Sequence, residues 1–74
     1  IDPPYAMMAD DALRERVLIQ VKNIEPYLAE DGFIILRTPL KPTKVDHKID
    51  QLHGPEIHKY GAGMWVLFYG KKDQ

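Results

Sequence analysis

The first residues that could carry chemistry are Asp2-Pro3-Pro4-Tyr5. The two prolines fix two backbone φ angles and remove two N–H donors, which leaves carbonyl acceptors beside a carboxylate and an aromatic ring. Such acceptors suit the exocyclic amine of a nucleobase, because they bond its hydrogens while the base stacks on the ring. An amine held in this way is oriented for attack on an electrophile, and the carboxylate stabilises the charge that develops on nitrogen. The alternative is a stiff N-terminal leader without a chemical role.

Three histidines, His47, His53 and His58, are the next candidates, as ligands of a metal ion. The chain has no cysteine, and the histidine spacings of six and five residues fit neither one helix face nor a common ligand pair. We therefore predict no metal site and expect these histidines on the surface or in a hairpin.

Aromatic and methionine side chains near the two ends of the chain have two interpretations. Four aromatic residues near the C-terminal end could stack on single-stranded nucleic acid. They are Tyr60, Trp65, Phe68 and Tyr69. Aromatic residues in strands, however, pack more often in a core. Met7 and Met8 could line a substrate cleft, although methionine more often fills irregular gaps in a core. The core interpretation is favoured for both groups.

Length, hydropathy and charge set the limits of the molecule. A chain of 74 residues allows one small domain. No apolar run is long enough to span a bilayer and no signal sequence is visible, so we expect a soluble, cytoplasmic protein without a membrane partner. Residues 1–36 carry seven acidic and three basic side chains, and residues 37–74 carry four and seven, which gives net charges of −4 and +3. The basic half could contact a phosphate backbone, but scattered lysines are more often simply solvated.

A single long helix is predicted after the opening turn. An apolar stripe recurs at intervals of three and four residues, formed by Leu13, Val17, Val21, Ile24 and Leu28. Asp10 is a plausible N-cap. Pro26 ends the regular helix near Ile24 and leaves Pro26–Leu28 as a short extra turn.

The remainder predicts a strand, a connection and a hairpin. Residues 33–36 are continuously apolar, which is typical of a strand covered on both faces. Residues 43–52 are ambiguous, and Val45, Ile49 and Leu52 suit one or two helical turns capped by Thr43 and Asp46. The segments 56–60 and 64–69 flank Gly61-Ala62-Gly63 and are predicted as the two arms of a hairpin. The unbroken apolarity of residues 64–69 places this second arm in the interior of the sheet, and the fold class is α/β.

The order of these motifs resembles a known family. Asp2-Pro3-Pro4-Tyr5 is similar to motif IV of the S-adenosylmethionine-dependent amino-methyltransferases. Together with "LRERVLIQVKNIEPYLAEDGFIILRT" and "GPEIHKYGAGMWVLFYG" it resembles the C-terminal part of the bacterial 16S rRNA guanine-N2 methyltransferase family. The resemblance extends over essentially all 74 residues, but only DPPY is a specific motif.

The resemblance implies a fold, an activity and roles for the four site residues. The fold would be the C-terminal half of a Rossmann-like class I methyltransferase sheet, with one long helix, a strand and a terminal β-hairpin in a three-stranded sheet whose last strand is central. Asp2 and the Pro3 carbonyl would accept hydrogen bonds from the target amine, Pro4 would hold the turn rigid, and Tyr5 would stack on the base. The substrate would be ribosomal RNA or a small-subunit assembly intermediate.

Two departures from the family pattern affect this interpretation. Family members often carry an acid just after the strand that here ends Leu36-Arg37-Thr38. The Gly-rich loop that holds S-adenosylmethionine has no counterpart, because Gly61-Ala62-Gly63 is a lone GxG in a hairpin. Residues 1–74 are therefore expected to be a C-terminal fragment that lacks the cofactor-binding half, is inactive alone and self-associates through an exposed sheet edge. The alternatives are a fragment of a DNA adenine-N6 methyltransferase and a non-catalytic α/β module that binds RNA or protein.

Overall fold

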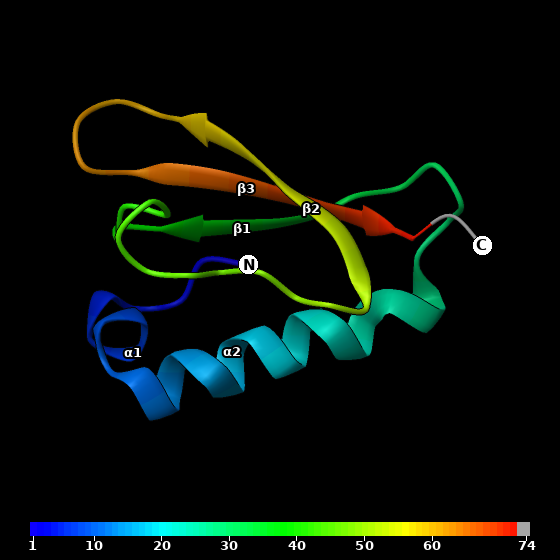
Figure 1. Cartoon of the computed structure of the whole chain (residues 1–74), viewed down its shortest axis with the longest axis horizontal. Helices are drawn as coiled ribbons and strands as arrows, with labels where there is room; N and C mark the ends of the chain where they lie inside the picture. The colour runs from blue at the N-terminus through cyan, green and yellow to red at the C-terminus, as the bar shows by residue number, and fades with distance from the viewer. Residues whose placement is uncertain (73–74) are drawn as a thin grey trace.

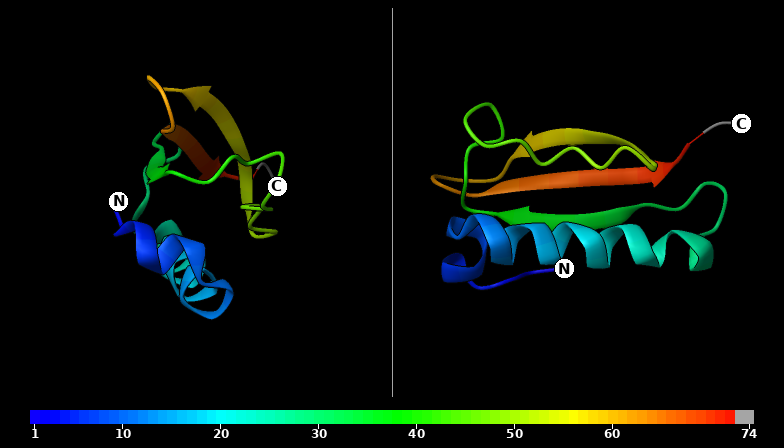
Figure 2. Two further views of the ribbon diagram at one scale, coloured as in Figure 1. Left: turned by 90° about the vertical axis from the view of Figure 1, so that its left-hand side faces the viewer. Right: turned by 60° about the horizontal axis from the view of Figure 1, so that its bottom comes forward.

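The computed structural model describes residues 1–72, which form two layers (Figure 1). The chain is mixed α/β, with two helices packed on one face of a three-stranded antiparallel sheet. Figure 2 shows the helix layer lying along a single face of the sheet. The principal extents of the molecule are 33 × 25 × 18 Å.

The helix layer consists of α1 (Tyr5–Ala9), α2 (Asp11–Ile24) and the 3₁₀ turn η1 (Glu25–Tyr27). The Asp10 carboxylate accepts a hydrogen bond from the Leu13 amide at 2.9 Å, which confirms the predicted N-cap. The α-helix ends at Ile24 and Pro26 lies in the 3₁₀ turn, as the proline predicts.

The sheet consists of β1 (Ile34–Thr38), β2 (Leu52–Lys59) and β3 (Trp65–Lys71) in the order β1-β3-β2. Both ladders are antiparallel, with Leu36 opposite Leu67 and Ile57 opposite the same residue on the other side. The prediction that the last strand is central is confirmed. The hairpin is confirmed as well, but β2 begins earlier than predicted and contains a bulge between His53 and Glu56.

A glycine at this bulge allows the close approach of β2 to β3. Gly54 has a φ of +105°, and a Cβ at this position would lie 2.7 Å from the Phe68 carbonyl oxygen. A residue with a side chain would therefore face both a strained backbone and a steric clash.

The core lies between α2 and the sheet. Buried apolar residues come from the helix layer (Met8, Val17, Leu18 and Val21), from β1 and β3 (Ile34, Leu36, Leu67 and Tyr69) and from the segment that leads into β2 (Ile49 and Leu52). Met7 is half-buried against this core. Burial of Met8 and Tyr69 confirms the core interpretation for these two residues, whereas Tyr60 is exposed.

The predicted helix over residues 43–52 is wrong. The segment has a turn at residues 42–44, an irregular stretch at residues 46–49 and a second turn at residues 50–51 directly before β2. Asp46 does not cap a helix, because its carboxylate accepts from the Lys48 amide at 2.8 Å. Ile49 and Leu52 flank the second turn, in which the Leu52 amide donates to the Ile49 carbonyl at 3.0 Å, and both are buried in the core, so their apolar character reflects burial rather than a helical face.

The prediction that β1 is covered on both faces is also wrong. Ile34 and Leu36 face the helices and are buried, whereas Phe33 and Ile35 are 59% and 43% exposed. On the same uncovered face, Phe33 and His58 pack edge-on against Phe68, with ring centroids 6.0 and 5.1 Å apart. We call this side the open face of the sheet.

Candidate functional site

The tetrapeptide Asp2-Pro3-Pro4-Tyr5 forms the entry to α1 at one end of the molecule. Pro4 is the N-cap residue of α1, and its carbonyl accepts hydrogen bonds from Met7 and Met8 at 3.1 and 3.3 Å. Proline suits this position because its φ is already restricted. The carbonyl of Pro3 takes part in no hydrogen bond within residues 1–72. Both Asp2 and Tyr5 are exposed, so the two side chains that could take part in chemistry are accessible to a ligand.

Residue Ile1 ties this turn to the edge of the sheet. The Ile1 nitrogen donates to the Ile35 carbonyl at 2.6 Å, and the Ile1 carbonyl accepts from the Arg37 amide at 2.9 Å. In a parallel pair of strands, the amide and the carbonyl of one residue bond to the two neighbours of the residue opposite it. Ile1 bonds in this way to the two neighbours of Leu36. The chain direction at Ile1 is therefore that of β1, and the turn follows at the carboxyl end of β1.

Arg37 contacts the turn from the last part of β1. Its Nη1 lies 3.6 Å from Asp2 Oδ2, and its Cζ lies 5.8 Å from the centroid of the Tyr60 ring. Both side chains of the ion pair are substantially exposed, so the pair contributes little to stability. Its effect is geometric, because it connects the turn to the hairpin through one guanidinium.

A buried polar network lies behind this end of the sheet. His47 Nε2 is 3.2 Å from Thr38 Oγ1, and His47 Nδ1 is 2.8 Å from the Val45 carbonyl oxygen. Because a carbonyl only accepts, Nδ1 carries the proton and Nε2 accepts from the Thr38 hydroxyl. Burial lowers the pKa of His47, and the hydrogen bond to Val45 opposes this shift only in part. His47 is therefore neutral and structural, and the expectation of a surface histidine is wrong at this position.

Tyr69 completes the network from β3. Its hydroxyl donates to the His47 carbonyl at 2.6 Å, and burial raises the pKa of this phenol far above its usual range. Residues 39–47 are thus held against the sheet by side-chain bonds. His53 and His58 lie in β2 and are exposed, as predicted, and His58 bonds to Glu56 at 2.9 Å.

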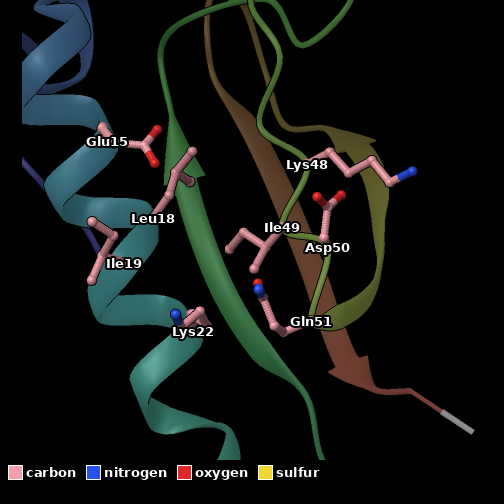
Figure 3. A pocket seen from close by; sticks show the side chains of 8 residues that line it. All are labelled: Glu15, Leu18, Ile19, Lys22, Lys48, Ile49, Asp50 and Gln51. Carbon is pink, nitrogen blue, oxygen red and sulfur yellow. The ribbon is translucent and has the colours of Figure 1, made fainter.

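A shallow groove of about 380 Å³ lies between α2 and the segment before β2 (Figure 3). It is lined by Glu15, Leu18, Ile19, Lys22, Lys48, Ile49, Asp50 and Gln51. Charged side chains of both signs surround it, and no residue of the DPPY turn contributes to it. The groove therefore offers no extension of the candidate site.

Within residues 1–72 the structure shows neither a metal cluster nor a membrane-spanning helix. No group of three or more histidine, cysteine, aspartate or glutamate side chains in that range is placed to hold a metal ion. None of the described helices combines the length and apolar character that a membrane crossing requires.

Comparison of the chain with protein-family models, with curated proteins and with solved structures finds no match.

The sequence singled out the turn but missed its partners. The four predicted residues lie together because they are consecutive, and the structure adds Arg37 to them. Nothing in the sequence indicates that contact, because it depends on the pairing of Ile1 with β1. The His47 network could have been suspected only from the clustering of Thr38 and His47 around a proline-rich loop.

Proposed function

We propose that residues 1–74 are the base-binding and catalytic part of an S-adenosylmethionine-dependent methyltransferase that acts on an exocyclic amine of a nucleobase. Guanine N2 in ribosomal RNA is the preferred target, because the order of motifs along the whole chain is similar to that family. In this proposal the chain is the C-terminal fragment of a longer enzyme and is inactive by itself.

The observation that carries the proposal is the placement of DPPY at the carboxyl end of β1. Ile1 pairs in parallel with β1, α2 follows, and the chain returns in β1, which is the connectivity of a strand-helix-strand unit. Ligands of open α/β sheets bind beyond the carboxyl ends of their strands. A DPPY turn at this position therefore lies where ligand chemistry occurs in such sheets.

The roles of the residues follow from their accessible atoms. Asp2 engages Arg37 through Oδ2, which leaves Oδ1 to accept from the target amine. The Pro3 carbonyl supplies a second acceptor, and two acceptors orient both N–H bonds and favour a pyramidal nitrogen. Tyr5 presents its exposed ring for stacking on the base.

The cofactor is assigned to a part of the enzyme outside this chain. S-adenosylmethionine supplies the methyl group in such enzymes, but the described residues do not fit it. Gly61 and Gly63 lie at the exposed tip of the hairpin, and the groove beside α2 is separate from the turn. The role of residues 1–72 is therefore to bind and orient the base.

The test uses the complete protein encoded by the reading frame that contains these residues. In single-turnover methylation of ribosomal RNA or assembly intermediates, Asp2→Ala should lower the rate by about a hundredfold to a thousandfold, the typical loss for one acceptor aimed at a developing charge. Cofactor affinity, measured by calorimetry, should stay unchanged because Asp2 faces the amine. Tyr5→Phe should be mild, since the ring alone provides the stacking.

A matched control for Asp2→Ala is Asp31→Ala, which removes an exposed carboxylate from the turn before β1. This variant should methylate at the normal rate. Full activity of Asp2→Ala in the same assay contradicts the proposal, and it leaves the non-catalytic α/β module as the better interpretation. Methylation of DNA adenine instead of RNA would keep the mechanism and change the substrate.

A further inference from the structure

Arg37 holds the beginning of the DPPY turn through two separate contacts. Its backbone amide donates to the Ile1 carbonyl at 2.9 Å, and its side-chain Nη1 lies 3.6 Å from Asp2 Oδ2. One residue of β1 thus contacts two consecutive residues, one through its backbone and one through its side chain. The backbone bond fixes where the turn lies, and the side-chain contact acts on the direction of the Asp2 carboxylate.

Within residues 1–72 the Asp2 carboxylate has no other restraint. Arg37 is its only ion-pair partner in that range, and none of the side-chain hydrogen bonds there reaches it. An exposed carboxylate that rotates about two side-chain bonds samples many directions, and few of them aim an oxygen at a given amine. Contact with Arg37 through Oδ2 selects the directions in which Oδ1 is free to accept a hydrogen bond.

The Arg37 side chain is itself held on the open face of the sheet. Arg37 is opposite Val66 of β3, and Val66 is opposite His58 of β2. Tyr60, two residues after His58, faces the same side. Its ring centroid lies 5.8 Å from Arg37 Cζ, a distance at which a guanidinium is attracted to an aromatic ring. The Tyr60 amide donates to the Met64 carbonyl at 2.9 Å, so the closed end of the hairpin fixes the position of this ring.

The Arg37–Asp2 pair has two opposite effects on an amine bound at Asp2. The pair is weak while water surrounds it, but a base over the turn excludes water and strengthens the attraction between the two charges. Restraint of the carboxylate then favours attack by a correctly oriented amine. The guanidinium also offsets part of the carboxylate charge, which weakens stabilisation of the charge on nitrogen. Restraint predicts slower methyl transfer without Arg37, whereas the offset predicts faster transfer.

We propose that Arg37 is a positioning residue for methyl transfer, which directs the Asp2 carboxylate towards the target amine, and that Tyr60 holds the Arg37 guanidinium in place. In this role Arg37 touches neither the amine nor the cofactor. The inference rests on the proposed function and adds to it two residues outside the DPPY turn.

The test uses the complete protein in the single-turnover assay with ribosomal RNA. Arg37→Met keeps the apolar stem and removes the guanidinium, while the backbone amide can still bond to Ile1. The rate at saturating RNA should fall by about tenfold, less than for Asp2→Ala, because the carboxylate still reaches the productive direction part of the time. Affinity for RNA and for the cofactor should stay unchanged. Arg37→Lys should restore most of the rate, because the contact with Asp2 involves a single nitrogen.

A double variant separates positioning from a structural role. In an Asp2→Ala background Arg37→Met should lower the rate no further, because no carboxylate is left to direct. Tyr60→Ala alone should lower the rate by about two- to fivefold, and Tyr60→Phe should restore it, because the ring alone attracts the guanidinium. The matched controls are Arg16→Met, an exposed arginine of α2, and Tyr27→Ala, an exposed tyrosine of η1, which should both be fully active.

Three results would overturn the inference. Unchanged or faster transfer by Arg37→Met would show that restraint of Asp2 is not limiting. A loss in RNA affinity instead of rate would make Arg37 an RNA contact. An equal loss in the Asp2→Ala background would show a structural role. The Arg37 side chain is 43% exposed, so its variants should fold normally, which circular dichroism checks, and Arg37→Gln replaces Arg37→Met if that variant unfolds.

Failure of this inference is distinguishable from failure of the proposed function. Full activity of Asp2→Ala contradicts the proposed function, and it removes the role of Arg37 as well. Impaired Asp2→Ala together with fully active Arg37→Met contradicts only the role of Arg37.

Discussion

The two faces of the sheet differ sharply although they are built from the same strands. Towards α2, β1 and β3 bury Ile34, Leu36 and Leu67, and the polar groups among them are paired. On the open face, Phe33 and Ile35 stay exposed, and Phe68 packs against the rings of Phe33 and His58. β1 and β3 carry apolar side chains on both faces, yet only one face is covered by the helices. Apolar residues therefore show that a strand face can be buried, but they do not show which element covers it.

The largest expected effect separates two adjacent residues of β1. Leu36→Ala should lower the free energy of unfolding by about 2–5 kcal/mol, because it empties a buried site, whereas Ile35→Ala should cost less than about 1 kcal/mol. Urea denaturation of the two variants measures both values. Equal losses would break the comparison, since they would mean that the open face is buried in solution.

Self-association is the next test, and it concerns the edge and open face of β1. Ile1 satisfies only the Ile35 carbonyl and the Arg37 amide along that edge, and partly unpaired edges recruit strands from other chains. We expect sedimentation velocity to detect association that rises with concentration. Ile35→Lys should weaken it by about tenfold, or about 1.4 kcal/mol, by placing a charge in the contact. A monomer at all concentrations would contradict this expectation.

The smallest effect concerns pH and the buried His47 on the helix side of the sheet. Burial lowers the pKa of His47, so the unfolded chain takes up the proton first as pH falls through about 6.5. The stability contributed by neutral His47 is therefore complete above that pH and is lost progressively below it. Urea midpoints between about pH 7 and 5 should fall less steeply in His47→Gln than in the unchanged chain.

Local signals predicted most of the fold, and non-local contacts account for the errors. Asp10, Pro26 and Gly61-Ala62-Gly63 act on the backbone within a few residues of themselves, so the helix ends and the hairpin follow from the sequence. Residues 43–52 were interpreted as helical because Val45, Ile49 and Leu52 have the right spacing. The segment is instead irregular, and His47 within it is held against the sheet by bonds to Thr38 and Tyr69, which no local pattern reports.

The same division applies to the candidate site. The DPPY turn stands out because its residue types are unusual together, and its position at the end of β1 agrees with the function that they suggest. Arg37 joins the site only through the parallel pairing of Ile1, and Tyr60 only through the register of the hairpin. Partners that are brought in by strand pairing are therefore the part that sequence inspection misses.

The central position of β3 has a consequence for the order of folding during synthesis. β1 and β2 emerge from the ribosome first, but they do not pair with each other, because β3 lies between them. Until Trp65–Lys71 has emerged, β2 has no strand partner, and β1 has only the bonds that Ile1 makes on its other edge. The β2–β3 hairpin forms from local contacts, whereas the β1–β3 pairing joins segments that are distant in sequence, which slows completion of the sheet and gives chaperones an opportunity to bind.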